Sequence, residues 1–327
     1  MPLVAGSVRE VSRQVRVGVV CGFLIGAGVA VQGRINGALG ARLEDGVAAA
    51  TISFGTGLFA LAIVFAVSGR VRDGARRVRG ALSDGALRPW QLLGGLCGAF
   101  FVACQGLTVA AIGVTAFTVA TVAGQLLSSL VVDRLGLGPS GRTPITGVRL
   151  AGASLGVVAV LIAGFGHSRA TGGLSVPEAL RGTPAALLIV LPALAGIGLA
   201  WQQAVNGKVG AVGGAFSAAM VNFCVGLVAL SILTAAIVVT SGGPEAFPTE
   251  PWLYLGGLIG VAFIALAALT VRWIGVLLLG LTSVAGQLLA SLILDVLTPT
   301  SAGLTTTAIV GCVLTLVAVA VATRSQS

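Results

Sequence analysis

Apolar runs of about 20 residues, separated by short polar or glycine-rich stretches, recur along nearly the whole chain. A helix of about this length is sufficient to cross the hydrocarbon core of a bilayer. The pattern predicts ten such helices, covering 17–38, 46–68, 90–112, 114–133, 147–166, 184–207, 213–240, 252–271, 274–295 and 303–323. The connections around Gly113 and Arg272 are so short that the helices they join must be antiparallel neighbours.

Composition supports a membrane location for these helices. The 327 residues are 56% hydrophobic and only 9% charged, with a mean hydropathy of +1.06. Soluble domains carry about 25% charged residues, so we expect an all-α polytopic protein embedded in the lipid bilayer. The formal charge of +9 could suggest nucleic acid. The chain has no basic face with interleaved aromatic residues, so we expect no nucleic-acid partner.

The distribution of positive charge predicts the orientation of the chain. If the N-terminus is cytoplasmic, the cytoplasmic loops carry 15 of the 19 cations, the outer loops carry three, and Arg34 lies within the first helix. We therefore expect a multi-pass protein of the cytoplasmic (inner) membrane with both termini in the cytoplasm.

An internal repeat is visible in two stretches, 123–133 and 285–295. Both follow the pattern Ala-Gly-Gln-Leu-Leu-x-Ser-Leu-x-x-Asp. The similarity extends over 98–133 and 260–295, where 18 of 36 positions are identical at an offset of 162. The first and sixth helices share Gly-x-Gly-x-Ala-x-Gln followed by Asn-Gly, at an offset of 170. The second and seventh helices match at an offset of 169.

These offsets predict two homologous five-helix repeats, 1–166 and 184–327, joined by an external loop at 167–183. Because five is odd, the second repeat enters the membrane from the opposite side. Inverted repeats of this kind are typical of secondary transporters. Each half could adopt the conformation of the other, which would produce inward-open and outward-open states of similar energy.

Ten helices in inverted five-helix repeats resemble the drug/metabolite transporter superfamily. The paired Gln-x-x-x-Asn-Gly motifs at 32–37 and 202–207, with the two Ala-Gly-Gln-Leu-Leu stretches, resemble the YdcZ-like family within it. Members of that family are often single five-helix halves, and this chain resembles a fused double copy. The resemblance implies the transporter fold of that superfamily and the movement of a small molecule, without saying which.

Two glutamines are the first candidates for substrate binding. Gln125 lies 11 residues into its predicted helix, about 16 Å deep at about 1.5 Å per residue. This depth is close to the midplane of a hydrocarbon core about 30 Å thick. Gln287 is similarly central in the second half. Substrate sites of inverted-repeat carriers lie near this level, so we expect both side chains to line the substrate path.

Two amide pairs are the second set of candidates. Gln32 and Asn36 lie one helical turn apart, as do Gln202 and Asn206. Their side chains could bind a polar substrate, or they could join helices by hydrogen bonds within the membrane. The sequence leaves both interpretations open. Trp201 could be a stacking platform for substrate or a packing aromatic.

Three charged residues complete the candidate site. Asp133 and Asp295 end their helices on opposite sides of the membrane, where each could be a solvated helix end, a gate or a proton relay. Arg34 could extend to the interface or attract an anionic substrate.

Enzymatic chemistry finds no support in the chain. The spans contain no Ser/His pair or metal cluster, and the sequence has no nucleotide-binding loop. The five cysteines fit small packing residues with neither disulfides nor a metal site. We expect no enzyme, no cofactor and no metal.

The sequence therefore predicts a secondary transporter that moves a small polar or amphipathic metabolite or drug, with export as the expected direction. Coupling to a proton or another ion is one interpretation, and a facilitator of a neutral or zwitterionic solute is another. The alternative from a different class is a non-transporting membrane assembly factor or receptor. Both a monomer and a homodimer fit the sequence.

Overall fold

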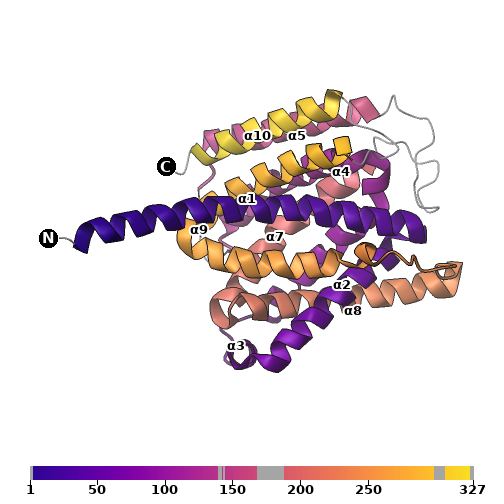
Figure 1. Cartoon of the computed structure of the whole chain (residues 1–327), viewed down its shortest axis with the longest axis horizontal. Helices are drawn as coiled ribbons and strands as arrows, with labels where there is room; N and C mark the ends of the chain where they lie inside the picture. Colours follow the sequence, from indigo (N-terminus) through magenta and orange to yellow (C-terminus); the bar gives the residue numbers. More distant parts are fainter. Residues whose placement is uncertain (1–2, 139–141, 143, 168–187, 298–305, 325–327) are drawn as a thin grey trace.

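The computed structural model describes residues 3–138, 142, 144–167, 188–297 and 306–324, and every regular element in these ranges is helical (Figure 1). The helices are α1 Leu3–Leu43, α2 Gly46–Val67, α3 Gly69–Ser83, α4 Gly94–Leu135, α5 Gly147–His167, α7 Val190–Gly213, α8 Ala215–Ser241, α9 Gly256–Leu297 and α10 Thr306–Arg324. Short 3-10 helices, η1 Pro89–Leu92 and η3 Pro251–Tyr254, precede α4 and α9. The predicted loop at 167–183 lies almost wholly outside the described residues.

Four of the described segments are long and apolar enough to cross a membrane: Arg16–Leu43, Gly46–Val67, Pro89–Leu135 and Ala215–Ser241. The expected class, an all-α polytopic membrane protein, is therefore confirmed. The beginning of α1 and the end of α10 lie at the same end of the bundle (Figure 1).

Helix α4 contains two spans joined by a sharp bend. The predicted turn lies at Gly113, whose backbone angles of φ 81° and ψ 159° are open to glycine and strained for other residues. Before this bend, the first arm of α4 runs antiparallel to α7, because Gly94 lies against Asn206 and Gly98 lies against Gln202.

The second arm of α4 folds back along α7. Gly124 lies 26 residues beyond Gly98, which would be about 39 Å in a straight helix. It nevertheless packs against Ala193, only nine residues from Gln202 on α7. Helix α7 therefore lies against both arms of an α4 hairpin.

Helix α9 forms the matching hairpin around α1. Phe263 lies against Gly28 and Ser283 lies against Gly26, although 20 residues separate the two α9 positions. A straight helix would place them about 30 Å apart, so α9 must fold back between them. The predicted turn around Arg272 lies in this interval, although the backbone there is assigned to one helix, Gly256–Leu297.

The two halves run in opposite directions. Gly33 and Gly37 of α1 face Gln105 and Val109 of the first α4 arm in the same order, so these two helices are parallel. Because α7 is antiparallel to that arm, α1 and α7 are opposed. The inverted repeat expected from the odd helix count is thus present.

Equivalent glycines in the two halves make equivalent close contacts. A methyl group added at Gly26 would overlap the carbonyl oxygen of Ser283, and one added at Gly196 would overlap that of Thr121. The offsets between these positions, 170 and 162, are those of the sequence repeat. The most extensive helix contacts are α1 with α9 and α4 with α7. The first helix of each half therefore packs against the hairpin of the other half.

The two halves also meet at a pair of aromatic residues. The rings of Phe54 on α2 and Phe223 on α8 lie 4.9 Å apart between centroids, tilted by 37°. They are equivalent positions at the offset of 169. Each ring also packs against a glycine of the other half, Gly226 for Phe54 and Gly57 for Phe223.

Two segments are more helical than the sequence suggested. The predicted Arg-rich loop after the second span contains α3, a 15-residue helix with strongly segregated polar and apolar faces. The polar residues before 17, expected to precede the first helix, continue α1 back to Leu3. In both places helical structure is present outside the predicted apolar spans.

We predict that Gly196→Ala lowers the free energy of unfolding by about 1–3 kcal/mol, because the new methyl group meets backbone that cannot rotate away. Gly55→Ala on α2 is the matched control, since no atom lies within 4 Å of the added carbon. Thermal unfolding in detergent measures both. Equal melting temperatures for the two variants would contradict the close crossing of α7 and α4.

Candidate functional site

The first amide pair lies in a buried contact between α1, α4 and α9. Gln32 Nε2 donates to the carbonyl oxygen of Gly256 at 3.0 Å, and Asn36 Nδ2 donates to Gln105 Oε1 at 2.7 Å. The three amide side chains are buried. Asn36 Oδ1 and Gln105 Nε2 have no partner among the described residues, so the cluster keeps one acceptor and one donor unused.

The second amide pair makes a different contact. Asn222 Oδ1 on α8 accepts hydrogen bonds from Gln202 Nε2 at 2.8 Å and from Asn206 Nδ2 at 2.9 Å. Gln202 Oε1 is buried and, in the described part of the chain, has no partner. Both amide pairs therefore join helices while leaving hydrogen-bonding capacity free.

The two central glutamines differ in their surroundings. Gln125 Nε2 donates to Gln203 Oε1 of α7 at 3.0 Å, and Gln203 is exposed. Gln287 is half-buried and its side chain makes no hydrogen bond within the described ranges. Its backbone N–H lies beside Gly26, where α9 crosses α1. The structure thus links Gln125 to α7 and leaves the Gln287 amide available.

Three threonines on the second arm of α4 add hydroxyl groups near Gln125. Thr115, Thr118 and Thr121 are each at most 1% exposed. Their hydroxyls find no partner among the described residues. Thr118, Thr121 and Gln125 recur at spacings of three and four, so they share one face of the helix. This face is a buried polar stripe beside the α7 contact.

Asp295 has a specific backbone contact in the other half. Its carboxylate accepts from the N–H of Val114 at 3.0 Å and from that of Thr115 at 2.8 Å. These N–H groups begin the second arm of α4, just after Gly113, and have no partner within that helix. The buried carboxylate therefore acts as an N-cap supplied by the opposite repeat.

The other sequence candidates lie nearer the surface of the bundle. Asp133 and Arg34 are half-buried and both have polar partners. Trp201 stacks on Trp90 of η1, with ring centroids 6.4 Å apart and planes 26° apart. One face of the Trp201 ring is thus occupied by protein, which favours the packing interpretation.

Sequence reasoning missed three partners of the predicted amides. Gln105, Gln203 and Asn222 were not among the candidates. Gln105 could have been found from the sequence, because it is a polar residue within an apolar span. Its counterpart at the offset of 162 is Ala267. Asn222 was visible as a polar position in the repeat, where Ser53 is its counterpart.

The chemistry of these groups is that of neutral hydrogen bonding. The amides and hydroxyls can donate to and accept from a polar solute. Among the described residues, no group of three His, Cys, Asp or Glu side chains could hold a metal ion.

We predict that Asp295→Leu destabilises the protein by about 1–3 kcal/mol, because two buried N–H groups lose their acceptor. Asp295→Asn keeps one side-chain oxygen as acceptor and should recover part of the loss. Asp84→Ala, at an exposed position after α3, is the control and should leave the melting temperature unchanged. A fully stable Asp295→Asn protein with no transport would instead assign chemistry to the carboxylate.

Comparison with solved structures supports the fold. One solved structure, described only as "Crystal structure of protein", aligns with this chain at a TM-score of 0.51 and 20% sequence identity. The alignment covers 97% of this chain and 99% of that chain. At this identity the likeness shows the fold alone. A search of curated proteins finds no match.

A family model matches the chain twice, over residues 17–162 and 187–321. Its description is "Putative inner membrane exporter, YdcZ". The two matches fall on the two halves that the internal repeat defines and together cover most of the chain. The protein therefore belongs to the YdcZ family of membrane transporters, within the drug/metabolite transporter superfamily, as a double-repeat member.

Proposed function

We propose that the protein is a secondary transporter that exports a small polar or amphipathic solute by alternating access. The observation that supports this most directly is the reciprocal packing of opposed halves, in which α1 lies in the α9 hairpin and α7 in the α4 hairpin. Equivalent contacts on both sides mean that exchanging the conformations of the two halves would cost little free energy. The exporter description of the family supports the direction.

The proposed functional units are 1–166 and 184–327, connected at 167–183. The proposed path lies between them and is lined near its middle by Gln125 and Gln287. The buried stripe of Thr118 and Thr121 extends this lining along α4. A buried hydroxyl or amide without a partner carries a free-energy cost of about 1–3 kcal/mol, and a bound solute or water would offset this cost.

The proposed solute is neutral or zwitterionic. The groups proposed to bind it are amides and hydroxyls, which offer donors and acceptors but no net charge. Arg34 is half-buried and has partners in the protein, so an anionic solute has no dedicated charge in the proposed lining.

The four flanking amides have a second proposed role. Gln32, Asn36, Gln202 and Asn206 join helices in the present structure. Each cluster keeps a buried polar atom without a protein partner in the described residues. We propose that these amides exchange interhelical hydrogen bonds for solute contacts as each end of the path opens.

The proposed mechanism does not include coupling to protons. Both oxygens of Asp295 accept backbone N–H groups of the opposite half, which favours a structural role for this carboxylate. Facilitated movement without a coupling ion is therefore our preferred mechanism. A pH gradient across liposomes would drive accumulation only under the coupled mechanism.

We predict that Gln125→Leu abolishes transport and leaves stability nearly unchanged. Leu keeps a similar volume but removes the amide, and hydrogen bonds within membranes contribute only about 0.6 kcal/mol on average to stability. The measurements are solute flux in liposomes and melting temperature on the same purified variant, with the solute first found by a thermal-stabilisation screen.

Gln91→Leu is the matched control for this experiment. Gln91 is buried and lies in η1, where its Oε1 accepts from the backbone N–H of Arg88 at 2.8 Å, and it is not among the residues proposed to bind solute. It should lower stability and leave flux per folded molecule intact. Normal flux through Gln125→Leu with reduced stability would remove the binding role. The absence of saturable flux for any solute found in the screen would favour the assembly-factor or receptor alternative.

We predict that both termini face the cytoplasm and that residue 174 faces outside, as the cation distribution indicates. A single cysteine at 174 in a cysteine-free protein should react with a membrane-impermeant maleimide added to intact cells. A cysteine at 85, in the turn after α3, is the opposite-side control. Labelling of the cysteine at 85 alone from outside would show that the protein has the opposite orientation.

A further inference from the structure

The amphipathic helix α3 has no role in the proposed solute path. It begins two residues after Val67, the last residue of the membrane-spanning α2, with Ser68 between them. On α2, the side chains of Phe59, Ile63 and Val67 are 68%, 51% and 77% exposed, as expected for a surface that faces lipid. The first turn of α3 therefore lies at the perimeter of the bundle, at the level of the lipid headgroups.

The apolar face of α3 covers the junction of α7 and α8. Gly74 lies directly against the carbonyl oxygen of Gly213 and the hydroxyl of Ser217, and Val78 packs against Gly213. Val71, Gly74 and Val78 are buried by this contact. The position of α3 is thus determined by packing on the second half.

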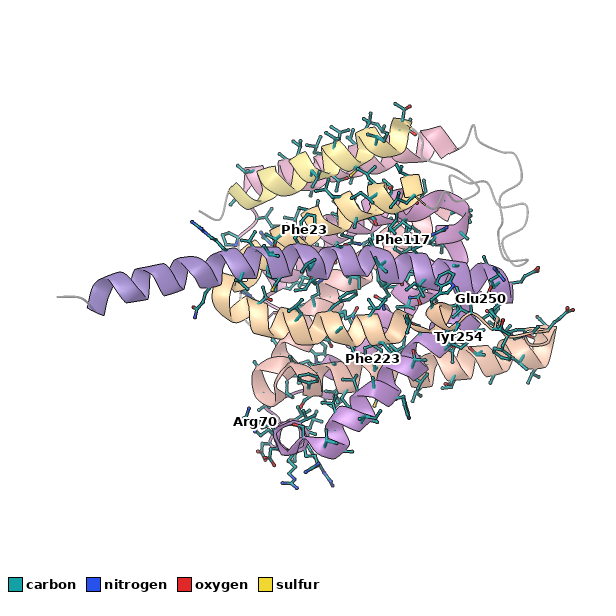
Figure 2. All side chains as sticks on the ribbon, viewed as in Figure 1. Phe23, Arg70, Phe117, Phe223, Glu250 and Tyr254 are labelled. Atoms are coloured by element: carbon teal, nitrogen blue, oxygen red, sulfur yellow. The ribbon has the colours of Figure 1, made fainter. Side chains whose placement is uncertain are left out.

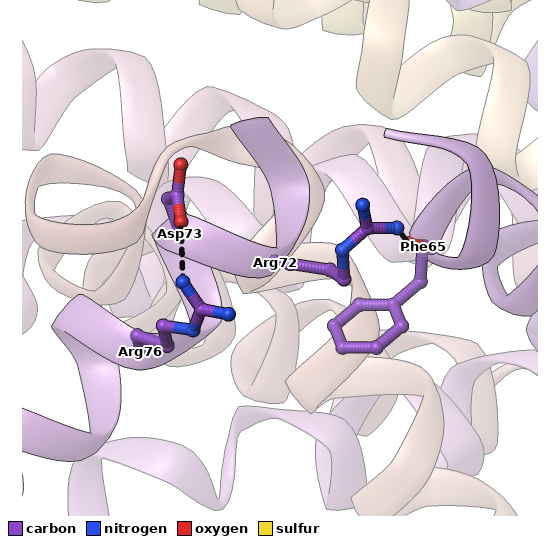
Figure 3. Close-up of polar contacts among 4 residues, drawn as sticks. All are labelled: Phe65, Arg72, Asp73 and Arg76. Atoms are coloured by element: carbon purple, nitrogen blue, oxygen red, sulfur yellow. Dashed lines mark hydrogen bonds and ion pairs between the residues drawn. The ribbon is translucent and has the colours of Figure 1, made fainter. Parts of the chain in front are cut away.

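Two of its five arginines fasten α3 to helix ends. Arg72 Nη1 donates to the carbonyl oxygen of Phe65 at 3.1 Å (Figure 3). It also donates to the carbonyl oxygen of Ala66, at the end of α2. Arg77 Nε donates to the carbonyl oxygen of Val212, at the end of α7, at 3.1 Å. Guanidinium groups at these positions satisfy carbonyls left without partners at helix C-termini.

The remaining three arginines of α3 are exposed. Arg70 and Arg79 are exposed and have no hydrogen-bond or ion-pair partner among the described residues. Arg76 pairs with Asp73 at 3.0 Å, and the two side chains are 77% and 58% exposed (Figure 3). An exposed pair of this kind contributes little, so Arg76 is also available to another anion.

The corresponding connection in the second half has the opposite character. Residues 242–250 contain Glu245 and Glu250 and no Lys or Arg. Glu250 forms an ion pair with Arg42 at 3.0 Å. Arg70 and Glu250 lie at opposite ends of the molecule (Figure 2). The positive charge on α3 is therefore not a property of the repeat but belongs to one membrane face.

We propose that Arg70, Arg76 and Arg79 form a binding surface for the phosphate groups of anionic phospholipids in the leaflet beside α3. The surface joins the lipid-facing side of α2 at the headgroup level, and its charge complements a phosphodiester. Guanidinium groups bind phosphate oxygens bidentately, which holds a headgroup more specifically than an ammonium does. The surface is distinct from the solute path and does not depend on transport.

The test is a lipid titration of the purified full chain followed by native mass spectrometry, with phosphatidylglycerol and phosphatidylcholine as probes. The protein should retain phosphatidylglycerol preferentially. Each arginine near an anionic surface contributes about fivefold, so the triple variant Arg70→Gln, Arg76→Gln and Arg79→Gln should bind phosphatidylglycerol at least about tenfold more weakly. Phosphatidylcholine binding should not change.

Asp73→Asn is the matched control of opposite sign. It removes the one carboxylate of α3 and should leave phosphatidylglycerol binding equal or tighter. If the triple variant does not fold, Arg79→Gln alone replaces it and should show a smaller loss of phosphatidylglycerol binding. Equal binding of the two lipids, or undiminished phosphatidylglycerol binding by the arginine variants, would overturn the proposal. Preferential binding of soluble polyphosphate over phosphatidylglycerol would also overturn it, in favour of a soluble polyanion.

Discussion

The close approach of helix backbones at glycine is the constraint on which the rest of this structure depends. Within a membrane the lipid chains are as apolar as leucine, so helix association relies on packing and polar contacts. At Gly26 and Gly196 the leading helix of each half lies directly on a carbonyl group of the opposite hairpin. The exchange of helices between halves follows from these crossings, and the two repeats form one bundle.

The hairpins create a second requirement, since a sharp bend within a membrane leaves backbone N–H groups without partners. In α4 the bend at Gly113 leaves the N–H groups of Val114 and Thr115 without partners in their own helix, and Asp295 of the other half accepts from both. This contact explains why the repeated motif ends in aspartate. Asp133 ends the same motif in the first half.

The two halves depart from exact symmetry in their polar contacts. Asn36 pairs with Gln105 of α4, whereas its counterpart Asn206 pairs with Asn222 of α8. The hydroxyl stripe of α4 is also unequal, because the positions matching Thr118 and Thr121 are glycine and serine. The two halves therefore offer different hydrogen-bonding groups at equivalent positions. The basic helix α3 marks the same inequality at the membrane surface.

The sequence alone determined the fold class, the two repeats and their inversion, because apolar span length, residue identity at fixed offsets and an odd helix count are all local or countable properties. It also placed the turn at Gly113, where glycine has a conformational reason to recur. It selected the amides Gln32, Asn36, Gln202 and Asn206 as interior groups, but it could not assign their partners. The tertiary structure alone decided those partners, the capping of α4 by Asp295 and the helical form of α3. Each of these depends on which backbone segments the glycine crossings bring together, and hydrogen bonds between residues 69, 78 or 181 positions apart leave no trace in local pattern.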